Sequence, residues 1–374
     1  MTNRATSPGL WALAWRRLRA DKVAMVSLAV VAAFLAMLAL SSSGLIVADW
    51  EDEVGVNYAP PSFAGAAGGL AAKSPGAPEA ALPDNAFDPL ADDIKALRAE
   101  LGKGARQVTS AALDMYGQVD PLAAEVEQLR AELRAATPGD VAAKQTARRE
   151  TLPFGADKWG HDVIKKTIKG AETSIVVGLV AALLAVSLGT LFGAVSGYYG
   201  GLVDDFFNWF YSIFTSIPSI LMILTVAAVL QQKGVTTMVL ILGLTGWTGP
   251  FRLIRAEYMK HKAREYVMAA DAIGASSWRK MFAHIFPNVS HVALVQLSIL
   301  VVGFIKAEVI LSFLGFGVPV GVVSWGSMLN EAQNELILGK WWQLTAAAFA
   351  MALLVTAFSL FTDALRDALD PKLK

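Results

Sequence analysis

Residues 264–288 read R-E-Y-V-M-A-A-D-A-I-G-A-S-S-W-R-K-M-F-A-H-I-F-P-N and form a polar, helix-prone stretch between two strongly apolar parts of the chain. Gly274 is a typical helix stop, and one of the serines at 276–277 can cap a second helix by accepting hydrogen bonds from its free N–H groups. Pro287 is expected to end that second helix. The stretch therefore predicts two short helices joined by a tight turn, the first over residues 265–273.

The small residues of this stretch have a recognisable spacing. Ala269 and Ala270 are followed after three residues by Gly274, a pattern that resembles the cytoplasmic "EAA" loop of ABC importer permeases. Further matches are Gly246-Trp247, Arg252 to Ala256, Glu265 to Val267, Gly274 to Ser276 and Pro287-Asn288. Together these segments look like the C-type permease subunit of oligopeptide, dipeptide and nickel importers.

The resemblance implies that this loop docks as a helix into a groove on an ATPase subunit, a recognised mode of helix binding. The small residues Ala269, Ala270 and Gly274 are expected to permit a close approach. Met268 stands where the general motif has Glu, so a Glu-specific contact cannot be carried over. The coupling residues that the resemblance implies are Arg264, Glu265, Tyr266, Met268, Ala269, Ala270, Ile273, Gly274, Ala275 and Ser276. An ordinary surface helical hairpin is the alternative interpretation of the same stretch.

The composition is that of a polytopic membrane protein. Of the 374 residues 55% are hydrophobic, and the mean hydropathy is +0.47. There is no cysteine, and the four histidines are not spaced as ligands, so we expect no disulfide and no metal site. No G-x-x-x-x-G-K-[ST] sequence is present to hold the phosphates of ATP. The chain is therefore not expected to be an enzyme, and any ATP hydrolysis must come from another chain.

Six apolar segments approach the ~20 residues that a membrane-spanning helix requires. They cover residues 23–48, 174–194, 206–230, 236–254, 292–314 and 341–361. Pro218 should kink the third helix. Glycines at 189, 193 and 197 share one helix face and should let a neighbouring helix approach closely. The sequence thus predicts an all-α protein with six transmembrane helices, for which the resemblance implies the type I ABC importer permease fold.

The chain divides into four parts by composition. Residues 1–22 form a basic, amphipathic lead-in, expected to lie at the membrane interface, and residues 23–48 are the first membrane helix. Residues 49–161 form an insert with a Pro/Gly/Ala-rich linker and two helices predicted to pair through leucine stripes. Residues 162–374 are the five-helix permease core, which contains the coupling loop at 255–288. Whether the insert is a solvated decoration or a docking surface for another subunit stays open.

Charge in the short loops sets the orientation. Residues 252–280 carry seven Lys or Arg against three acidic residues, so this loop is expected to be cytoplasmic. Counting helices back from it, both termini are cytoplasmic and the insert lies outside the membrane. The insert holds 18 Asp or Glu against 11 Lys or Arg over residues 49–161, which argues against binding to anionic lipid.

Two ionisable residues lie within the fifth apolar segment, where such groups are costly and are therefore functional candidates. These are Lys306 and Glu308, and their spacing points them to different helix faces. Glu308 stands where the family's A-E-x-x-L-S-F-L-G motif has its Glu, whereas Lys306 departs from that motif. We expect Glu308 to face the interior of the bundle, and both residues are candidates for the translocation path.

The resemblance implies a permease subunit of an ATP-driven importer, with di- or oligopeptides as the expected substrate and nickel or another small solute as the alternative. The resemblance implies a homologous B-type permease, two ATPase subunits that bind ATP and magnesium, and an extracytoplasmic solute-binding protein, all at the inner membrane of a bacterium. This chain itself would hold no cofactor and bind no nucleic acid. A secondary transporter is the competing class, but it would need inverted repeats and broken helices, which the sequence pattern does not show. A membrane-anchored scaffold is a third possibility.

Overall fold

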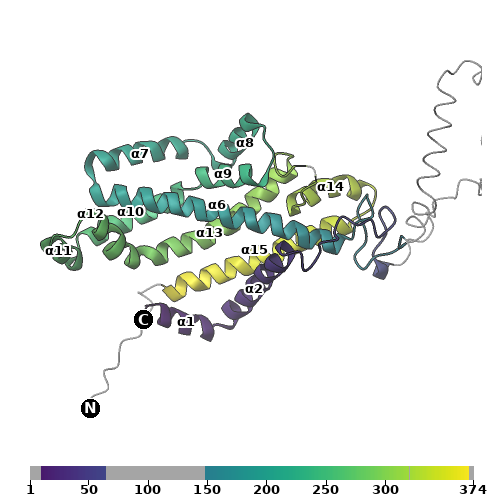
Figure 1. Cartoon of the computed structure of the whole chain (residues 1–374), viewed down its shortest axis with the longest axis horizontal. Helices are drawn as coiled ribbons and strands as arrows, with labels where there is room; N and C mark the ends of the chain where they lie inside the picture. Colours follow the sequence, from purple (N-terminus) through teal and green to yellow (C-terminus); the bar gives the residue numbers. More distant parts are fainter. Residues whose placement is uncertain (1–9, 65–147, 320, 370–374) are drawn as a thin grey trace, which may run out of the picture. The chain divides into compact units, whose positions relative to one another are not determined.

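The computed structural model describes residues 10–64, 148–319 and 321–369 (Figure 1). The chain divides into one unit made of residues 1–66 and 149–374 and a second unit made of residues 67–148. Only the first unit is described below. The linker and the helical pair expected within the insert lie outside the described residues.

The described residues form helices and, apart from these, only isolated β-bridges. The helices are α1 (Leu10–Ala20), α2 (Lys22–Ser42), η1 (Ser62–Ala64), α6 (Val163–Tyr199), α7 (Gly201–Thr215), α8 (Ser219–Leu230), α9 (Val235–Thr245), α10 (Thr248–Lys262), α11 (Glu265–Ala272), α12 (Ser277–Arg279), η2 (Lys280–Ile285), α13 (Phe286–Phe313), α14 (Trp325–Ile337) and α15 (Trp342–Leu369). The predicted all-α class is confirmed.

Among the described residues, five helical stretches are long and apolar enough to cross a membrane. A sixth span results if α7 and α8 are counted as one, because this pair passes the same test together but is bent by 82°. The bend lies at Pro218, as expected, since proline has no N–H to donate and its ring crowds the preceding turn. A broken helix is therefore present, and the expectation that this chain has none was wrong.

The first span is shorter than its apolar run suggested. The expected helix over residues 23–48 ends at Ser42, and Ser43 and Gly44 then lead the chain out of the helix. Gly44 has a φ of 73°, which most side chains avoid. The apolar residues 45–48 are not helical, because the helix has already ended at Ser43 and Gly44.

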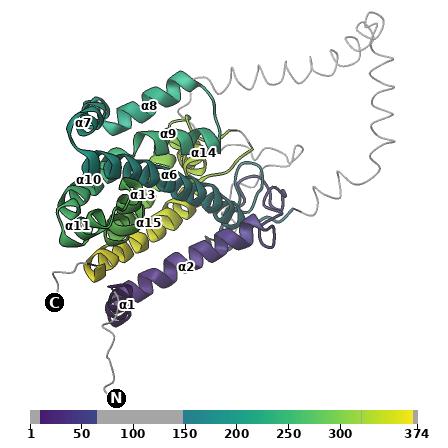
Figure 2. The same cartoon turned by 60° about the vertical axis from the view of Figure 1, so that its left-hand side comes forward.

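The long helix α6 organises the bundle, and α10 lies directly on it (Figure 2). A Cβ added to Gly189 would come within 2.6 Å of the carbonyl oxygen of Trp247. One added to Gly193 would stand 2.8 Å from the carbonyl oxygen of Phe251, and Gly197 is equally crowded. The expected close approach at the glycine face of α6 is confirmed, and the helix that approaches there is α10.

The lead-in helix α1 packs on protein along one face. Ala14 and Leu18 are buried in a cluster with Leu365 and Leu369, at the end of α15. Trp15, the residue after Ala14, is exposed. Part of the apolar surface of α1 therefore packs on α15, and the rest stays uncovered in this chain.

Pro287 does not end a helix, contrary to expectation. The chain runs helically from Ser277 to Phe313 through the π-helical segment η2, and Pro287 lies in the first turn of α13. The N–H of Phe286 bonds to the carbonyl of Met281, five residues back. Such a wide turn shifts the hydrogen-bond ladder by one residue, which lets a helix accommodate a proline ring.

Candidate functional site

The loop helix α11 is fixed to the bundle by its inner face. Val267 is buried in a cluster with Tyr258, Met281 and Ile285, and the hydroxyl of Tyr258 donates to the carbonyl of Met281 at 3.1 Å. Val267 and Ala270 lie one turn apart on the same side of the helix, as a period of 3.6 residues requires. This short helix is therefore held by packing against α10 and η2, not only by its own hydrogen bonds.

The turn after α11 has the geometry that the sequence predicted. Gly274 has a φ of 76°, and its N–H bonds to the carbonyl of Asp271 at 2.9 Å, while the N–H of Ala275 reaches the carbonyl of Ala270 at 3.0 Å. These two bonds close the helix end in the left-handed manner typical of glycine. The side chain of Ser276 accepts a bond from the N–H of Arg279 and so caps the next helix.

One of the small residues expected to permit docking faces inward. Ala270 is only 5% exposed, so its part in a close approach to an ATPase stays a prediction. Its neighbour Ala269 is exposed, as is Gly274, where an added Cβ would meet nothing within 4 Å. Gly274 is thus needed for the turn rather than for close packing within this chain.

The outer face of the loop is apolar. We define the loop patch as the exposed side chains of Tyr266, Met268, Ile273 and Trp278. Ile273 is 83% exposed, an unusual position for a branched aliphatic side chain in water. Exposed apolar side chains gathered on one short loop make that loop a candidate protein interaction site. Sequence reasoning included the first three of these residues but did not assign Trp278 to the surface.

Polar contacts brace the loop from both sides. The ring nitrogen Nδ1 of His261 lies 2.8 Å from the hydroxyl of Tyr266, and the ammonium of Lys280 pairs with Asp271. Partial burial raises the pKa of Tyr266, which keeps its hydroxyl neutral. The remaining coupling residues frame α11: Arg264 precedes its first turn in an extended conformation, and Glu265 begins it.

An ion pair connects the helix before the loop to the broken span. The guanidinium of Arg255 on α10 donates through Nε and Nη2 to the two carboxylate oxygens of Asp204 on α7, each at 2.6 Å. The hydroxyl of Ser196 and the amide of Asn208 donate to the same carboxylate. A two-point pair of this kind fixes orientation as well as distance. No sequence pattern predicted this pair, because the two residues are far apart in the chain.

Glu308 and Lys306 occupy different environments. Glu308 is 0% exposed, which confirms that it faces the bundle interior. The hydroxyl of Ser174 donates to it at 2.6 Å and that of Ser312 at 2.7 Å. Ser174 in turn accepts the backbone N–H of Trp325 at 3.2 Å. Glu308 therefore connects α6, α13 and the start of α14, whereas Lys306 is exposed on the surface of α13.

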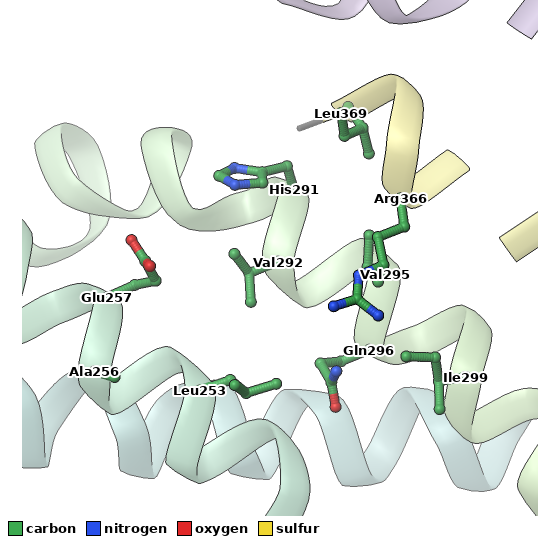
Figure 3. A pocket seen from close by; sticks show the side chains of 10 residues that line it. All are labelled: Leu253, Ala256, Glu257, His291, Val292, Val295, Gln296, Ile299, Arg366 and Leu369. Atoms are coloured by element: carbon green, nitrogen blue, oxygen red, sulfur yellow. The ribbon is translucent and has the colours of Figure 1, made fainter. Parts of the chain in front are cut away.

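A cavity of about 510 Å³ opens between α10, α13 and the end of α15 (Figure 3). Its lining residues are Leu253, Ala256, Glu257, His291, Val292, Val295, Gln296, Ile299, Arg366 and Leu369. Neither Glu308 nor Lys306 lines it. The residues that line the cavity come from three separate segments of the chain, so no local sequence pattern could predict it. No group of metal-ligating side chains occurs in the described part of the chain.

Two protein families match parts of this sequence. Residues 189–374 match the family described as the inner membrane component of binding-protein-dependent transport systems. Residues 9–61 match the N-terminal transmembrane domain of oligopeptide transport permease C. The second match covers α1, α2 and the segment just after them, and the first covers the core and its loop.

Individual relatives carry similar names. The dipeptide transport system permease protein DppC of Bacillus subtilis is 35% identical over 237 residues, which are 62% of this chain and 74% of the relative. The oligopeptide transport system permease protein OppC of the same organism is 36% identical over 221 residues, 59% of this chain and 72% of the relative. The peptidoglycan transport system permease protein YejE of Agrobacterium fabrum is 34% identical over 219 residues, 59% of this chain and 57% of the relative.

The helical bundle, the exposed loop helix and these matches point to one conclusion. The chain is an integral membrane protein that works with other components of its transport system, and it is not an enzyme. It belongs to the family of binding-protein-dependent transport system inner membrane components, as a C-type permease subunit of an ATP-driven ABC importer.

Proposed function

We propose that this permease carries di- or oligopeptides and that it forms the translocation path together with a homologous B-type permease. The names of the relatives support the substrate class, since DppC is a dipeptide and OppC an oligopeptide transport permease. Both relatives match over most of their own length. The YejE relative transports a peptide-containing polymer according to its name, which is compatible with the same class.

The loop patch is the docking surface for one of two ATPase subunits in this proposal. The observation that carries it is the contrast between the two faces of α11: Val267 and Ala270 are buried in the bundle, while Met268 and Ile273 point away from it. A rigidly seated helix with an apolar outer face fits a groove on a partner. ATP and magnesium bind to the ATPase subunits, since the sequence of this chain has no phosphate cradle.

Motion of α11 can reach the membrane through contacts within this subunit. Closure of the ATPases around ATP would push on α11, which is packed against Tyr258 of α10. The pair between Arg255 and Asp204 then connects α10 to α7. Coupling of this kind requires two conformations, each favoured by a different ligand. The inward-facing and outward-facing forms of the path are those two states.

The orientation follows from charge and packing. The basic loop around α11 lies on the cytoplasmic side of the inner membrane, by the excess of Lys and Arg in residues 252–280. Val295, near the start of α13, packs with Leu18 of α1 and Leu369 of α15. The ends of α1 and α15 are thus on the same side as α11, which supports cytoplasmic termini. The opposite end of the bundle would receive an extracytoplasmic solute-binding protein.

Uptake in cells lacking this gene tests the substrate class. The deletion strain should lose uptake of a labelled dipeptide or tripeptide, and a plasmid carrying the gene should restore it. Labelled nickel offered to the same cells should enter at the rate of the parent strain. Loss of nickel uptake with unchanged peptide uptake would overturn the peptide assignment in favour of the alternative substrate, while leaving the permease assignment intact.

A further inference from the structure

Glu335 is a buried carboxyl group without a partner. It lies on α14, at the end of the bundle opposite α11 (Figure 1). Glu335 is 1% exposed, and neither oxygen of its carboxyl group has a hydrogen-bond partner among the described residues. A buried carboxylate in that position would carry an uncompensated charge, which is strongly unfavourable.

A salt-bridge network lies beside it. The ammonium of Lys166 on α6 is 2.7 Å from Oδ2 of Asp157 and 2.6 Å from Oε2 of Glu331. Glu331 also belongs to α14 and precedes Glu335 by one helical turn, so both acids share a face of the helix. The amide of Gln343 on α15 donates to Glu331 at 3.2 Å. Lys166 therefore pairs with Asp157 on one side. On the other side, α14 offers it two carboxyl groups, those of Glu331 and Glu335.

The neighbouring segment completes the network. Asp157 is fully buried and accepts the backbone N–H groups of Trp159 and His161 at 2.8 Å and 3.0 Å. Nδ1 of the His161 ring lies 2.9 Å from the same carboxylate. Burial acts to raise the pKa of Asp157, but the His161 ring and the Lys166 ammonium outweigh it and hold that pKa well below its usual range, so this acid keeps its charge. Gly160 permits the tight turn, because a Cβ there would come within 2.2 Å of the carbonyl oxygen of Gly55.

Without Glu335 this network already carries one more negative charge than positive charge. The single positive charge of Lys166 faces the two negative charges of Asp157 and Glu331, and Glu331 is partly open to solvent. Burial raises the pKa of Glu335 to about 7. The charge of Lys166 opposes that rise, the charges of Asp157 and Glu331 add to it, and the main chain of Lys158 opposes it slightly. Burial thus favours the protonated, neutral form of Glu335.

We propose that Glu335 is a proton-binding site and that loss of its proton draws the ammonium of Lys166 from Glu331 to Glu335. The transfer moves the contact by one turn along α14 and so changes how α14 is held against α6. The proton has a route to the site, because Glu331 and His161 both retain some exposure to solvent. The site is distinct from the loop patch and does not depend on which solute is carried.

The direction of the stability effect follows from linkage. The pKa of Glu335 is about 7 in the folded protein against 4.5 for an ordinary glutamate, so the folded state holds the proton more tightly. The protonated carboxyl of Glu335 therefore contributes its full stability to the folded protein below about pH 4–5. This contribution to stability is lost as the pH rises through about 7. Glu335→Gln, which mimics the protonated form, should melt ~3 °C above the parent protein at pH 8 and level with it at pH 5.

Difference infrared spectroscopy on the purified protein observes the proton directly. The parent should show the C=O stretching band of a protonated carboxyl at pH 5, lose it between pH 6 and pH 8, and the Glu335→Gln variant should lack that band. A parent protein without the band at pH 5, or with a variant spectrum that still titrates in the same way, would overturn the proton site. A melting difference that is the same at both pH values would overturn it as well.

A second variant tests the movement of Lys166. Glu331→Gln removes its partner on α14, so the ammonium should move to Glu335 and the carboxyl band should vanish at a pH at least about one unit lower. Asp363→Asn, an exposed position on α15, is the charge-neutralising control and should leave the titration midpoint unchanged. An unchanged midpoint in Glu331→Gln would contradict the transfer of Lys166 while retaining the titration of Glu335 as a separate observation.

Discussion

Replacing Ile273 with aspartate should abolish ATP-driven uptake while leaving the protein folded in the membrane. Ile273 is 83% exposed in the isolated subunit, so the change disturbs no packing within the chain. In the assembled importer the same position would be buried against an ATPase, where an unpaired carboxylate costs ~3–5 kcal/mol. That cost corresponds to a loss of ~100-fold or more in affinity. The measurement is the amount of ATPase subunit that copurifies with the tagged permease, together with uptake.

Ile337 provides a matched control for this experiment. It is also an isoleucine with 83% exposure, but it ends α14 at the far end of the bundle from the loop. Ile337→Asp should retain the ATPase subunits at the level of the parent protein. Copurification that falls equally in both variants would show that a general defect, rather than the loop patch, is responsible.

Replacing Glu308 with leucine should impair uptake far more than replacing Lys306 with leucine. Leucine leaves the hydroxyls of Ser174 and Ser312 without their acceptor in a buried site, at ~1–3 kcal/mol for each unsatisfied group. The contact that positions the start of α14 through Ser174 is weakened at the same time. Lys306 is exposed on α13, and its long side chain can reach a polar region when the environment requires it.

Uptake in these variants is measured per unit of protein in the membrane, which separates transport from folding. Glu308→Gln keeps an acceptor for both serines without the charge and should retain more uptake than Glu308→Leu. Equal and negligible effects of the leucine changes at 306 and 308 would show that neither residue supports the path. A loss confined to Lys306→Leu would reverse the assignment.

Local patterns predicted much of this fold because they report local physics. The glycines at 189, 193 and 197 have no side chain, and the close approach of α10 follows directly from that absence. Gly274 ends α11 because it tolerates the left-handed conformation that closes a helix. Pro218 breaks a helix for want of an N–H donor. In each case the residue itself determines the outcome.

Other features depend on which neighbour a residue meets. Ala269 and Ala270 are the same residue in adjacent positions, and only the packing of α11 on η2 makes one exposed and the other buried. Pro287 was expected to end a helix by its usual rule, but the π-helical turn before it allows the helix to continue. In the sequence, Glu335 looks like any polar residue on an amphipathic helix. Its burial without a hydrogen-bond partner is visible only in the folded structure.

The energy source for transport tests the central claim most directly. Proteoliposomes would contain this permease, its partner permease and the ATPase subunits, with the solute-binding protein and a labelled dipeptide outside and ATP enclosed. We predict uptake that requires enclosed ATP, is unchanged when proton and sodium gradients are dissipated, and disappears when Ile273→Asp replaces the parent chain. Uptake by this chain alone, driven by an ion gradient without ATP, would contradict the account and favour a secondary transporter.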